Sequence, residues 1–585
     1  MPTIPAPVAQ DVILDVRNLK TWFGTGDKAV RAVDDVSFRM KRGETLCIVG
    51  ESGSGKSVTA RSILQIIDPP GRVLDGEILF SGGAQQKAGG QPIDIARLSP
   101  QSRAMRDIRG RDIAMIFQEP MTSLSPVHTI GWQIMEAMLI HQPINQAEAR
   151  ARTVELLRQV EIANPEKAVD RYTFEFSGGM RQRAMIAMAL ACNPQILIAD
   201  EPTTALDVTT QAEILTIIKE LQSRLGMSVL FITHDMGVVA EIADEVAVMR
   251  HGRLLEFGPV DQIFYQPQHD YTAALIDSVR RLENSARKSR SQSVSERKIL
   301  EVRDLSKSYP ARGGMLMRAG PGVRAVSDVS FDLYEGENLG IVGESGSGKS
   351  TLGNCLIRVH PPSAGEIRYT LGTGQVIDLA TLSHRELRPV HRELRMIFQD
   401  PFASLNPRMT VGQLIGEPLL VNGIAKGRAL KDRVGRLLET VNLPANVMDR
   451  YPHAFSGGQR QRIGVARALA LDPRLIIADE ATSALDVTVR SQILDLLLDL
   501  QERLALSYIL ISHDLGVIRY FCDRVAVMYR GNIVETGSTE KICTDPDHPY
   551  TKALLSAAPG SHPGDKRIMG RHRYVPVAEV MQAVA

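Results

Sequence analysis

The nine residues VGESGSGKS occur twice in this chain, at positions 49–57 and again at 342–350. Each copy follows an apolar stretch typical of a buried strand, and each fits the pattern G-x-x-x-x-G-K-[ST]. Glycines at this spacing let backbone N–H groups converge on phosphate oxygens, and a following helix adds the positive end of its dipole. We therefore predict two phosphate-binding loops, each between a strand and a helix of an α/β fold.

In this pattern the lysine reaches the β- and γ-phosphates and the serine hydroxyl ligates Mg²⁺. A glycine-rich turn without a ligand is the alternative for a single match, but two copies in the same context favour binding. The residues expected to form the first loop are Gly50, Ser52, Gly53, Gly55, Lys56 and Ser57. Those expected to form the second are Gly343, Ser345, Gly346, Gly348, Lys349, Ser350 and Thr351.

The rest of the chain is duplicated as well. "MIFQEPMTSLSP" (115–126) matches "MIFQDPFASLNP" (396–407), and "FITHDMGVV" (231–239) matches "LISHDLGVI" (510–518). The offset between the halves is 293 at the first glycine and 279 at the His-Asp pair, which predicts extra residues in the first half, around 81–92. We expect a domain at 1–283, a polar linker at 284–298, a second domain at 299–560 and an irregular tail at 561–585.

Bulk composition excludes several classes of protein. The chain has 585 residues, 68 basic and 67 acidic, and this near balance argues against a dedicated nucleic-acid binder. No signal peptide is expected at the N-terminus, and no apolar run reaches the roughly 18–20 residues that span a bilayer. The five cysteines show no metal-site spacing and are expected to be free thiols in a reducing cytosol.

A pair of carboxylates ends an apolar stretch in each half. Asp200 and Glu201 follow "ILIA", and Asp479 and Glu480 follow "LIIA". An aspartate at the end of such a strand completes the Mg²⁺ site of a phosphate-binding loop. The adjacent glutamate could polarise an attacking water, or it could be a solvated charge at the end of the strand.

A second phosphate-binding surface is expected in each half. The Ser-Gly-Gly sequences precede long helices and offer a hydroxyl and backbone amides at a helix N-terminus. They comprise Ser177, Gly178 and Gly179 in one half, and Ser456, Gly457, Gly458 and Gln459 in the other. Because one nucleotide rarely needs two such surfaces from one domain, each is expected to face a nucleotide held by the other half.

Taken in order, these motifs resemble the ATP-binding-cassette (ABC) ATPases over nearly the whole chain. The resemblance implies two tandem P-loop ABC nucleotide-binding domains, each a mixed sheet core with a helical subdomain, packed head to tail around two ATP molecules. One site would use Lys56, Ser57, Gln118, Asp200, Glu201 and His234, closed by Ser456 and Gly458; the other Lys349, Ser350, Gln399, Asp479, Glu480 and His513, closed by Ser177 and Gly179.

The resemblance also implies roles within these sites. Glu201, His234, Glu480 and His513 would be catalytic, and Ser57, Gln118, Asp200, Ser350, Gln399 and Asp479 would hold Mg²⁺. Phe23 and Tyr309 would stack on adenine, although an aromatic residue near a first strand can also be part of the core. We expect both sites to hydrolyse ATP, despite the difference between Met180 and Gln459 after the two Ser-Gly-Gly sequences.

Three uses of ATP fit a double cassette: driving an importer, acting on ribosomes and repairing DNA. DNA-repair members carry zinc-binding cysteines and large insertions, and twin cassettes that act on ribosomes have a long charged arm; this chain has neither. Both halves end alike, at 263–279 and 542–559, in a pattern around His269, Tyr271, His548 and Tyr550 that resembles the peptide/nickel/opine branch of bacterial importers. Simple capping of each domain would explain this ending equally well.

The preferred function is an ATPase of the translocase class that energises import of peptides or peptide-like solutes; a soluble ATPase acting on ribosomes is the alternative. The implied partners are two integral-membrane permeases and a periplasmic solute-binding protein, with no nucleic acid and with membrane contact only through the permeases. The implied location is the cytoplasmic face of the bacterial inner membrane. Only Cys543 lies where some relatives bind an iron–sulfur cluster, so no cluster is predicted.

Overall fold

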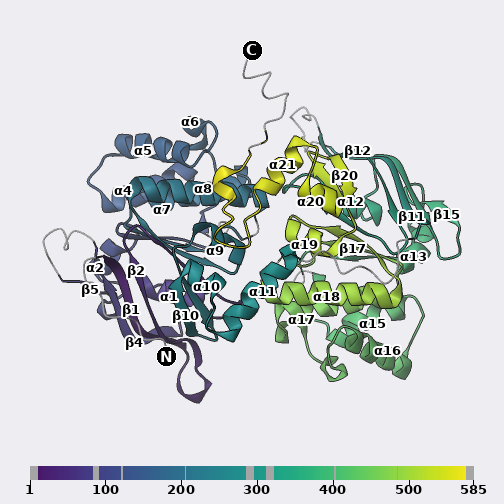
Figure 1. The fold of residues 1–585 in the computed structure, drawn as a ribbon, viewed down its shortest axis with the longest axis horizontal. Coiled ribbons are helices and arrows are strands. Elements are labelled where there is room, and N and C mark those ends of the chain that lie inside the picture. The colour runs from purple at the N-terminus through teal and green to yellow at the C-terminus, as the bar shows by residue number, and fades with distance from the viewer. Residues whose placement is uncertain are drawn as a thin grey trace, which may run out of the picture. The chain divides into compact units, whose positions relative to one another are not determined.

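The computed structural model of the protein describes residues 11–82, 91–119, 123–204, 206–284, 295–310, 322–400, 404–483, 485–572 and 574. The chain forms two compact units: Met1–Val279 with Pro559–Gly570, and Arg280–Ala558 with Arg571–Ala585 (Figure 1). The predicted insertion at 81–92 and the predicted linker at 284–298 lie largely outside the described residues, which omit 83–90 and 285–294.

A six-stranded mixed sheet forms the centre of the first unit. In spatial order its strands are β10 (Arg253–Pro259), β9 (Glu245–Arg250), β3 (Thr45–Val49), β8 (Ser228–Thr233), β7 (Ile196–Asp200) and β6 (Ile113–Ile116). Only the pair β9–β10 is antiparallel. Every residue of β3, β7 and β8 is buried, as expected for parallel strands covered on both faces. Their carboxyl ends meet at one edge, where the phosphate loop and the two strand-end motifs begin.

A second, antiparallel sheet packs against this core in the first unit. Its order is β2 (Val30–Lys41), β1 (Val12–Phe23), β4 (Gly71–Phe80) and β5 (Ile93–Asp94). Apolar side chains of both sheets form one buried cluster that includes Leu14, Phe38, Ile48 and Ile198. The phosphate loop therefore rests on a rigid base.

Helices complete the first unit. The core helices are α1 (Lys56–Ile63), α2 (Arg103–Ile108), α8 (Val208–Leu225), α9 (Met236–Ile242), α10 (Val260–Tyr265) and the part of α11 (Asp270–Asn284) up to Val279. A helical subdomain contains α4 (Ile130–His141), α5 (Gln146–Gln159), α6 (Pro165–Ala168) and α7 (Gly178–Leu190), grouped together in Figure 1. Short 3₁₀ turns occur at Gly26–Lys28, Ile95–Arg97, Thr173–Glu175 and Ile568–Gly570.

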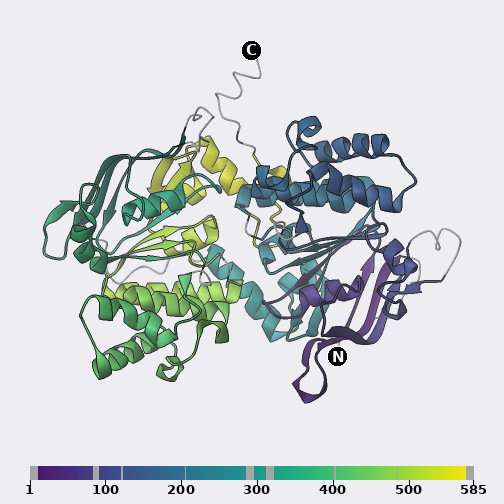
Figure 2. The same cartoon turned by 180° about the vertical axis from the view of Figure 1, so that it is seen from behind.

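The second unit repeats both sheets. The mixed sheet runs β16 (Leu394–Ile397), β17 (Leu475–Asp479), β18 (Ser507–Ile511), β13 (Asn338–Val342), β19 (Arg524–Tyr529) and β20 (Asn532–Ser538). The antiparallel sheet runs β12 (Val323–Tyr334), β11 (Lys298–Tyr309), β14 (Ala364–Thr370) and β15 (Val376–Asp378). These strands appear in dark to light green and yellow in the reverse view of Figure 2.

The helices of the second unit follow the same order. They are α12 (Lys349–Leu356), α13 (His384–Glu393), α15 (Val411–Val421), α16 (Gly427–Thr440), α17 (Gly457–Leu469), α18 (Val487–Leu504), α19 (Leu515–Phe521), α20 (Thr539–Thr544) and α21 (Pro549–Ser556), with 3₁₀ turns at Ala445–Val447 and Pro452–Ala454. The helical subdomain here is α15, α16 and α17. Among the described residues no helix combines the length and hydropathy needed to cross a bilayer.

Two aspartates, the last residues of the sequences "TALD" (204–207) and "SALD" (483–486), begin long helices. The Asp207 carboxylate accepts the backbone N–H of Thr210 at 2.9 Å, and the Asp486 carboxylate accepts that of Val489 at 2.9 Å. N-capping of this kind satisfies one of the free amides of a helix and favours its negative charge at the positive end of the dipole. These residues thus fix where α8 and α18 start.

Candidate functional site

The phosphate loop of the first cassette requires glycine at both ends. Gly50 has φ 151°, and a Cβ there would lie 2.1 Å from the Met249 carbonyl oxygen. Gly55 has φ 99° and begins α1, and its Cβ would lie 2.2 Å from the Ala32 oxygen. Within this loop the Lys56 ammonium donates to the carbonyls of Gly50, at 2.7 Å, and Glu51, at 2.9 Å. A buried cation is therefore held where the loop is predicted to bind phosphate.

The serine of the loop meets the strand-end aspartate. Ser57 Oγ donates to Asp200 Oδ1 at 2.8 Å, although the two residues are 143 positions apart in the chain. Asp200 is only 1% exposed, and burial raises the pKa of its carboxyl, outweighing the hydrogen bond from Ser57. A hydroxyl and a carboxylate oxygen are hard donors that suit Mg²⁺, and a divalent cation would offset the cost of burying this charge.

Glu201 is the centre of a polar network. Its Oε2 accepts hydrogen bonds from Gln118 Nε2, at 2.8 Å, and from Thr204 Oγ1, at 2.9 Å. Its Oε1 lies 3.2 Å from His234 Nδ1. The structure thus brings the predicted glutamine, glutamate and histidine together from three separate strand ends.

Ionisation of Glu201 is strongly favoured. Burial opposes it, but the hydrogen bond and charge of His234, with contributions from Thr204 and Lys56, outweigh burial and lower the pKa of Glu201 to about 2. Its backbone is also unusual, because a φ of 47° places this residue in the left-handed region. Such strain costs on the order of 1–3 kcal/mol and occurs mainly where the surrounding structure imposes it.

The second cassette repeats this geometry. Lys349 Nζ donates to the oxygens of Gly343 and Glu344, both at 2.7 Å, and Ser350 Oγ donates to Asp479 Oδ1 at 3.0 Å. Glu480, with φ 45°, accepts from Gln399 Nε2 at 2.7 Å and lies 3.2 Å from His513 Nδ1.

The ionisation of the second carboxylate pair follows the first. Burial raises the pKa of Asp479 to about 6, despite the hydrogen bond from Ser350. Burial also opposes ionisation of Glu480, but His513, Lys349 and Gln399 together lower its pKa. Each cassette therefore holds one ionised glutamate beside a costly buried aspartate.

The Ser-Gly-Gly sequences form helix N-termini as predicted. Ser177 Oγ accepts the N–H of Met180 at 3.3 Å at the start of α7, and Ser456 Oγ accepts that of Gln459 at 3.4 Å at the start of α17. In the second cassette Gln459 Oε1 also accepts the Ser456 N–H at 3.1 Å, which completes a capping box that Met180 cannot form. The role of these residues toward a nucleotide remains a prediction.

Phe23 and Tyr309 lie at the ends of β1 and β11. The Phe23 ring packs against Gly71, where a Cβ would come within 2.5 Å of the ring. The Tyr309 ring makes an edge contact with His360, at 6.0 Å between centroids, and lies under Lys307 Nζ at 5.2 Å. Both rings are half-buried, and their stacking on adenine also remains a prediction.

Two tyrosines belong to the site although no motif assigned them to it. The hydroxyl of Tyr271, on α11, accepts the N–H of Glu51 in the phosphate loop at 3.2 Å. The hydroxyl of Tyr550, on α21, accepts the N–H of Glu344 at 3.1 Å. The signal was available in the repeated ending of the two halves, but the sequence could not show that this ending reaches the loop.

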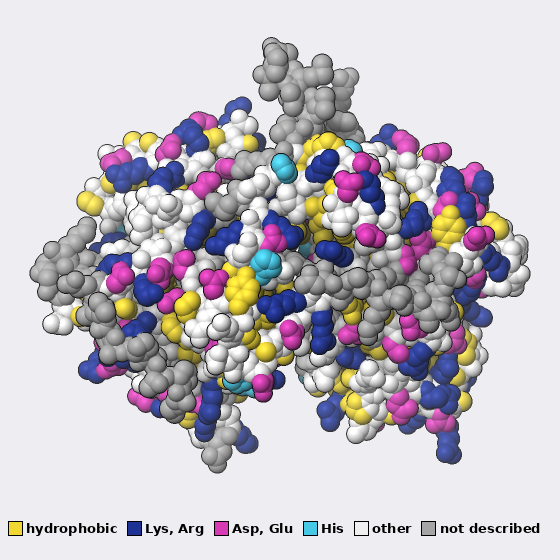
Figure 3. Space-filling view, in the orientation of Figure 1, with side chains coloured by type: hydrophobic (Ala, Val, Ile, Leu, Met, Phe, Trp, Pro, Cys, Tyr) yellow, Lys and Arg dark blue, Asp and Glu magenta, His cyan; other side chains and the backbone are white. Residues whose placement is uncertain are grey.

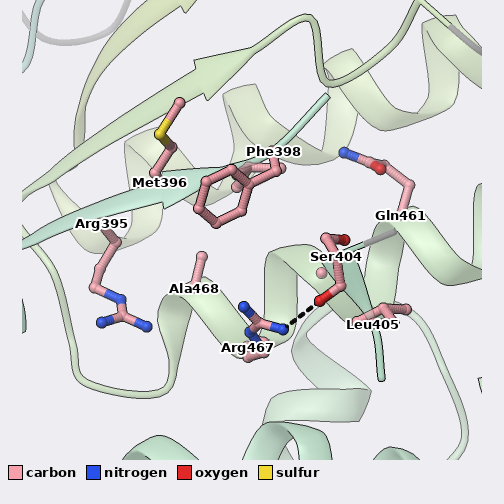
Figure 4. A pocket seen from close by; sticks show the side chains of 10 residues that line it. Arg395, Met396, Phe398, Ser404, Leu405, Gln461, Arg467 and Ala468 are labelled. Atoms are coloured by element: carbon pink, nitrogen blue, oxygen red, sulfur yellow. Dashed lines mark hydrogen bonds between the residues drawn. The ribbon is translucent and has the colours of Figure 1, made fainter. Parts of the chain in front are cut away.

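A small cavity lies beside Gln399 in the second cassette (Figure 4). It is lined by Arg395, Met396, Ile397, Phe398, Ser404, Leu405, Gln461, Gly464, Arg467 and Ala468, and Arg467 Nη1 donates to the Ser404 oxygen at 2.7 Å. By alignment of the motifs, the first cassette has Ala114, Met185 and Met188 in place of Arg395, Gly464 and Arg467. The second cassette is therefore cationic at a position where the first is apolar.

Comparison with known proteins identifies the family. The family model described as ABC transporter matches residues 33–204 and 326–483, and the model for the C-terminal region of oligopeptide/dipeptide transporters matches 255–308 and 534–582. The glutathione import ATP-binding protein GsiA of Shigella flexneri is 49% identical over 95% of this chain and 91% of its own length. GsiA of Salmonella typhimurium is 50% identical over the same shares.

A solved cassette structure also matches part of this chain. The dimeric ATP-binding cassette MJ0796 in a post-hydrolysis state bound to ADP and Pi is 29% identical, with a TM-score of 0.36, over 41% of this chain and 98% of that one. The family matches confirm the predicted fold class of two tandem cassettes with mixed sheets and helices. The chain belongs to the ABC transporter family, as an ATPase with two cassettes that each carry the C-terminal region of oligopeptide/dipeptide transporters.

Proposed function

We propose that this chain hydrolyses ATP at two composite sites and thereby drives import of glutathione or another short peptide-like solute. The observation that carries the proposal is the pair of complete glutamate networks, each with an ionised Glu held by a Gln and a His. The relatives reported above are import proteins by name, which supports an importer and gives no support to the ribosomal alternative.

In each site the chain's own groups account for the expected chemistry. Lys56 and the loop amides would bind the β- and γ-phosphates, and Glu201 would accept a proton from the attacking water. Because His234 directs Nδ1 toward Glu201, its Nε2 remains available to the γ-phosphate. This mechanism relies on positioning and charge stabilisation, with no covalent intermediate on the protein.

Mg²⁺ would be held by Ser57 and Asp200 in one cassette and by Ser350 and Asp479 in the other, with Gln118 and Gln399 as further oxygen donors. When bound, the ion neutralises charge on the β- and γ-phosphates. The donor set fits this assignment because it consists of hydroxyl, carboxylate and amide oxygens.

The two cassettes are proposed to close head to tail. The start of α17, with Ser456 and Gly458, would complete the site of Lys56, and the start of α7, with Ser177 and Gly179, would complete that of Lys349. This arrangement would give the exposed Ser177 and Ser456 a role at helix N-termini, which favour anions. Fusion in one chain raises the effective concentration of each half for the other.

Two integral-membrane permeases and a periplasmic solute-binding protein are the proposed partners, and the cytoplasmic face of the inner membrane the proposed location. The segment after Gln118, described except for residues 120–122, exposes Val127 by 73% and Trp132 by 43%, which suits a protein contact. At the aligned positions the second cassette has Arg408 and Gln413, which supports two different permeases. Figure 3 shows basic and acidic side chains interspersed on the face in view, unlike a nucleic-acid-binding stripe.

The test is steady-state ATP hydrolysis by Glu201→Gln and Glu480→Gln, each in the full chain with the permeases present. Loss of most activity in both variants is expected, because each removes one proton acceptor. Full activity in either variant would show that its site does not hydrolyse ATP. Pull-down of the double variant with ATP should recover two polytopic membrane proteins; recovery of ribosomes would refute the importer.

A further inference from the structure

The first peptide group of each phosphate loop is held from both sides. Its oxygen belongs to Gly50 and accepts from Lys56 Nζ at 2.7 Å; its N–H belongs to Glu51 and is accepted by the Tyr271 hydroxyl at 3.2 Å. A flip of this peptide plane would break both hydrogen bonds at once. The orientation of the loop therefore depends on one group inside it and one group from the C-terminal region of the cassette.

The second cassette reproduces the arrangement independently. Lys349 Nζ donates to the Gly343 oxygen at 2.7 Å, and the Tyr550 hydroxyl accepts the N–H of Glu344 at 3.1 Å. Tyr271 is 8% exposed and Tyr550 is 1% exposed, so both contacts are made away from bulk water. A contact that occurs twice between the same positions is a feature of the cassette design.

The turn before each tyrosine orients the tyrosine side chain toward the loop. His269 Nδ1 accepts the N–H of Tyr271 at 3.0 Å, and the Glu256 carboxylate accepts the N–H groups of Gln268, at 2.8 Å, and His269, at 3.2 Å. These contacts fix the start of α11 against β10. The histidine thus caps the helix, and the tyrosine reaches the loop.

The same contacts occur before Tyr550. His548 Nδ1 accepts the Tyr550 N–H at 3.1 Å, while Glu535 accepts from Asp547 at 2.7 Å and from His548 at 3.2 Å. Glu535 lies on β20, the strand that corresponds to β10. In both cassettes, a carboxylate on the last strand of the mixed sheet therefore fixes the orientation of the tyrosine.

We propose that Tyr271 and Tyr550 are positioning residues for ATP binding, which keep the phosphate loop oriented when its lysine turns to the phosphates. Once Lys56 binds phosphate, it no longer holds the Gly50 oxygen as it does here, and the tyrosine keeps the peptide in place. The inference rests on the proposed binding of ATP at both loops. It assigns a role in nucleotide binding to the C-terminal region of each cassette.

The two tyrosines differ in their surroundings, which gives a prediction for each. The Tyr271 ring lies beneath the Arg250 guanidinium at 4.6 Å. The Tyr550 ring packs against Tyr529, at 4.4 Å between centroids, and against Tyr574 of the C-terminal tail, at 5.6 Å. Tyr574 should therefore support the second loop and not the first.

The test measures ATP binding by equilibrium dialysis on the full chain. Tyr271→Phe is made in a Lys349→Ala background and Tyr550→Phe in a Lys56→Ala background, so that one intact loop is observed at a time. Phenylalanine keeps the buried ring and removes only the hydroxyl. We expect the Kd for ATP to rise about tenfold in each case, the equivalent of one hydrogen bond, with the free energy of unfolding lowered by no more than about 1 kcal/mol.

Tyr508→Phe is the matched control, because the Tyr508 hydroxyl is fully buried without a hydrogen-bond partner among the described atoms. Tyr508→Phe should leave the Kd for ATP unchanged in the Lys56→Ala background. Tyr574→Ala should raise the Kd in the Lys56→Ala background and leave it unchanged in the Lys349→Ala background. In the otherwise unchanged chain, Tyr→Phe should raise KM for ATP and spare kcat. An unchanged Kd would refute the positioning role, and so would a loss of ATP binding accompanied by a fall in the free energy of unfolding well beyond about 1 kcal/mol. A wild-type chain that fails to bind ATP would instead refute the proposed function.

Discussion

A buried carboxylate in the first unit is expected to hold residues 559–570 in place. Glu241, on α9, is 5% exposed and accepts three backbone N–H groups from this segment. Its Oε1 accepts from Arg567 at 2.8 Å and from Gly560 at 3.2 Å, and its Oε2 accepts from Ile568 at 3.4 Å. We predict that Glu241→Gln detaches the segment without unfolding the cassette.

The magnitude follows from these three bonds. A hydrogen bond to a charged acceptor contributes about 1.5–3 kcal/mol, against about 1 kcal/mol for a neutral one. A glutamine oxygen can keep the Arg567 and Gly560 donors as neutral bonds, but its NH₂ group then faces the Ile568 N–H. We therefore expect a loss of about 2.5 kcal/mol, the lower end of these values, which increases the open population of the segment about 70-fold.

Hydrogen–deuterium exchange followed by mass spectrometry measures this directly. Peptides covering 559–570 should exchange about 70-fold faster in Glu241→Gln, while peptides of β8 and α8 keep their wild-type rates. Glu220→Gln, which neutralises an exposed carboxylate on α8, should change neither. Wild-type exchange in the 559–570 peptides would refute the reasoning, and faster exchange throughout the cassette would show global destabilisation instead of local detachment.

Two further substitutions test the packing of the second cassette. Gly348→Ala places a Cβ 2.2 Å from the Ala325 oxygen at φ 102° and should lower the free energy of unfolding by more than about 2 kcal/mol, as in an overpacked site. Gly346→Ala has φ 78° and open space around the new Cβ, so it should cost only about 1 kcal/mol. Equal unfolding midpoints of the two variants in urea would contradict the steric argument. Asn338→Leu removes the buried amide that donates to Gln501 Oε1 at 2.9 Å and to the Phe521 oxygen at 3.0 Å. It should lower the free energy of unfolding in urea by about 2–4 kcal/mol. Thr45→Val, at the aligned position of the first cassette, loses one hydrogen bond of 3.1 Å to Gln222 and should lower it by about 1 kcal/mol.

The Asp-Glu pair of each site could be predicted from the sequence because it ends a strand of the parallel sheet, whereas Gln118 and His234 were predicted only through the resemblance to ABC ATPases. Strand-end residues share an edge whatever their separation in the chain, so motif order suffices to bring Ser57, Asp200 and Glu201 together. Spacing also predicted the duplicated fold. The left-handed backbone of Glu201 was not predictable, since it results from the tertiary contacts around the strand end.

Contacts made by the C-terminal regions were the part that sequence reasoning missed. Tyr271 lies 220 positions from Glu51, and Gly560 lies 319 positions from Glu241. Neither contact follows from periodicity, because each joins a turn or irregular segment to another element through a single side chain. The tail at 561–585, expected to be irregular, includes residues 561–570, which belong to the first unit together with Pro559 and Gly560 and contain a turn of 3₁₀ helix.

The duplication lets each cassette serve as a reference for the other. Lysine, tyrosine, glutamine, glutamate and histidine make the same contacts in both halves, which argues for the same chemistry at both phosphate loops. The differences lie around these groups. The final residue of β9 is Arg250, whereas that of β19 is Tyr529, and the penultimate residue of α9 is Glu241, whereas that of α19 is Tyr520.

These differences between the cassettes change the residues around each site and leave the groups that would bind phosphate the same. Tyr529 and Tyr574 pack on the tyrosine of the second loop, and Glu241 binds residues 559–570 in the first unit. Arg395 and Arg467 line a cavity of the second cassette at positions where the first cassette has the apolar residues Ala114 and Met188. Because the hydrolytic groups match, unequal behaviour of the two cassettes should arise from these surroundings. Substitutions there should alter ATP affinity or partner binding at one cassette, whereas substitutions of Glu201 and Glu480 should have equivalent effects on hydrolysis.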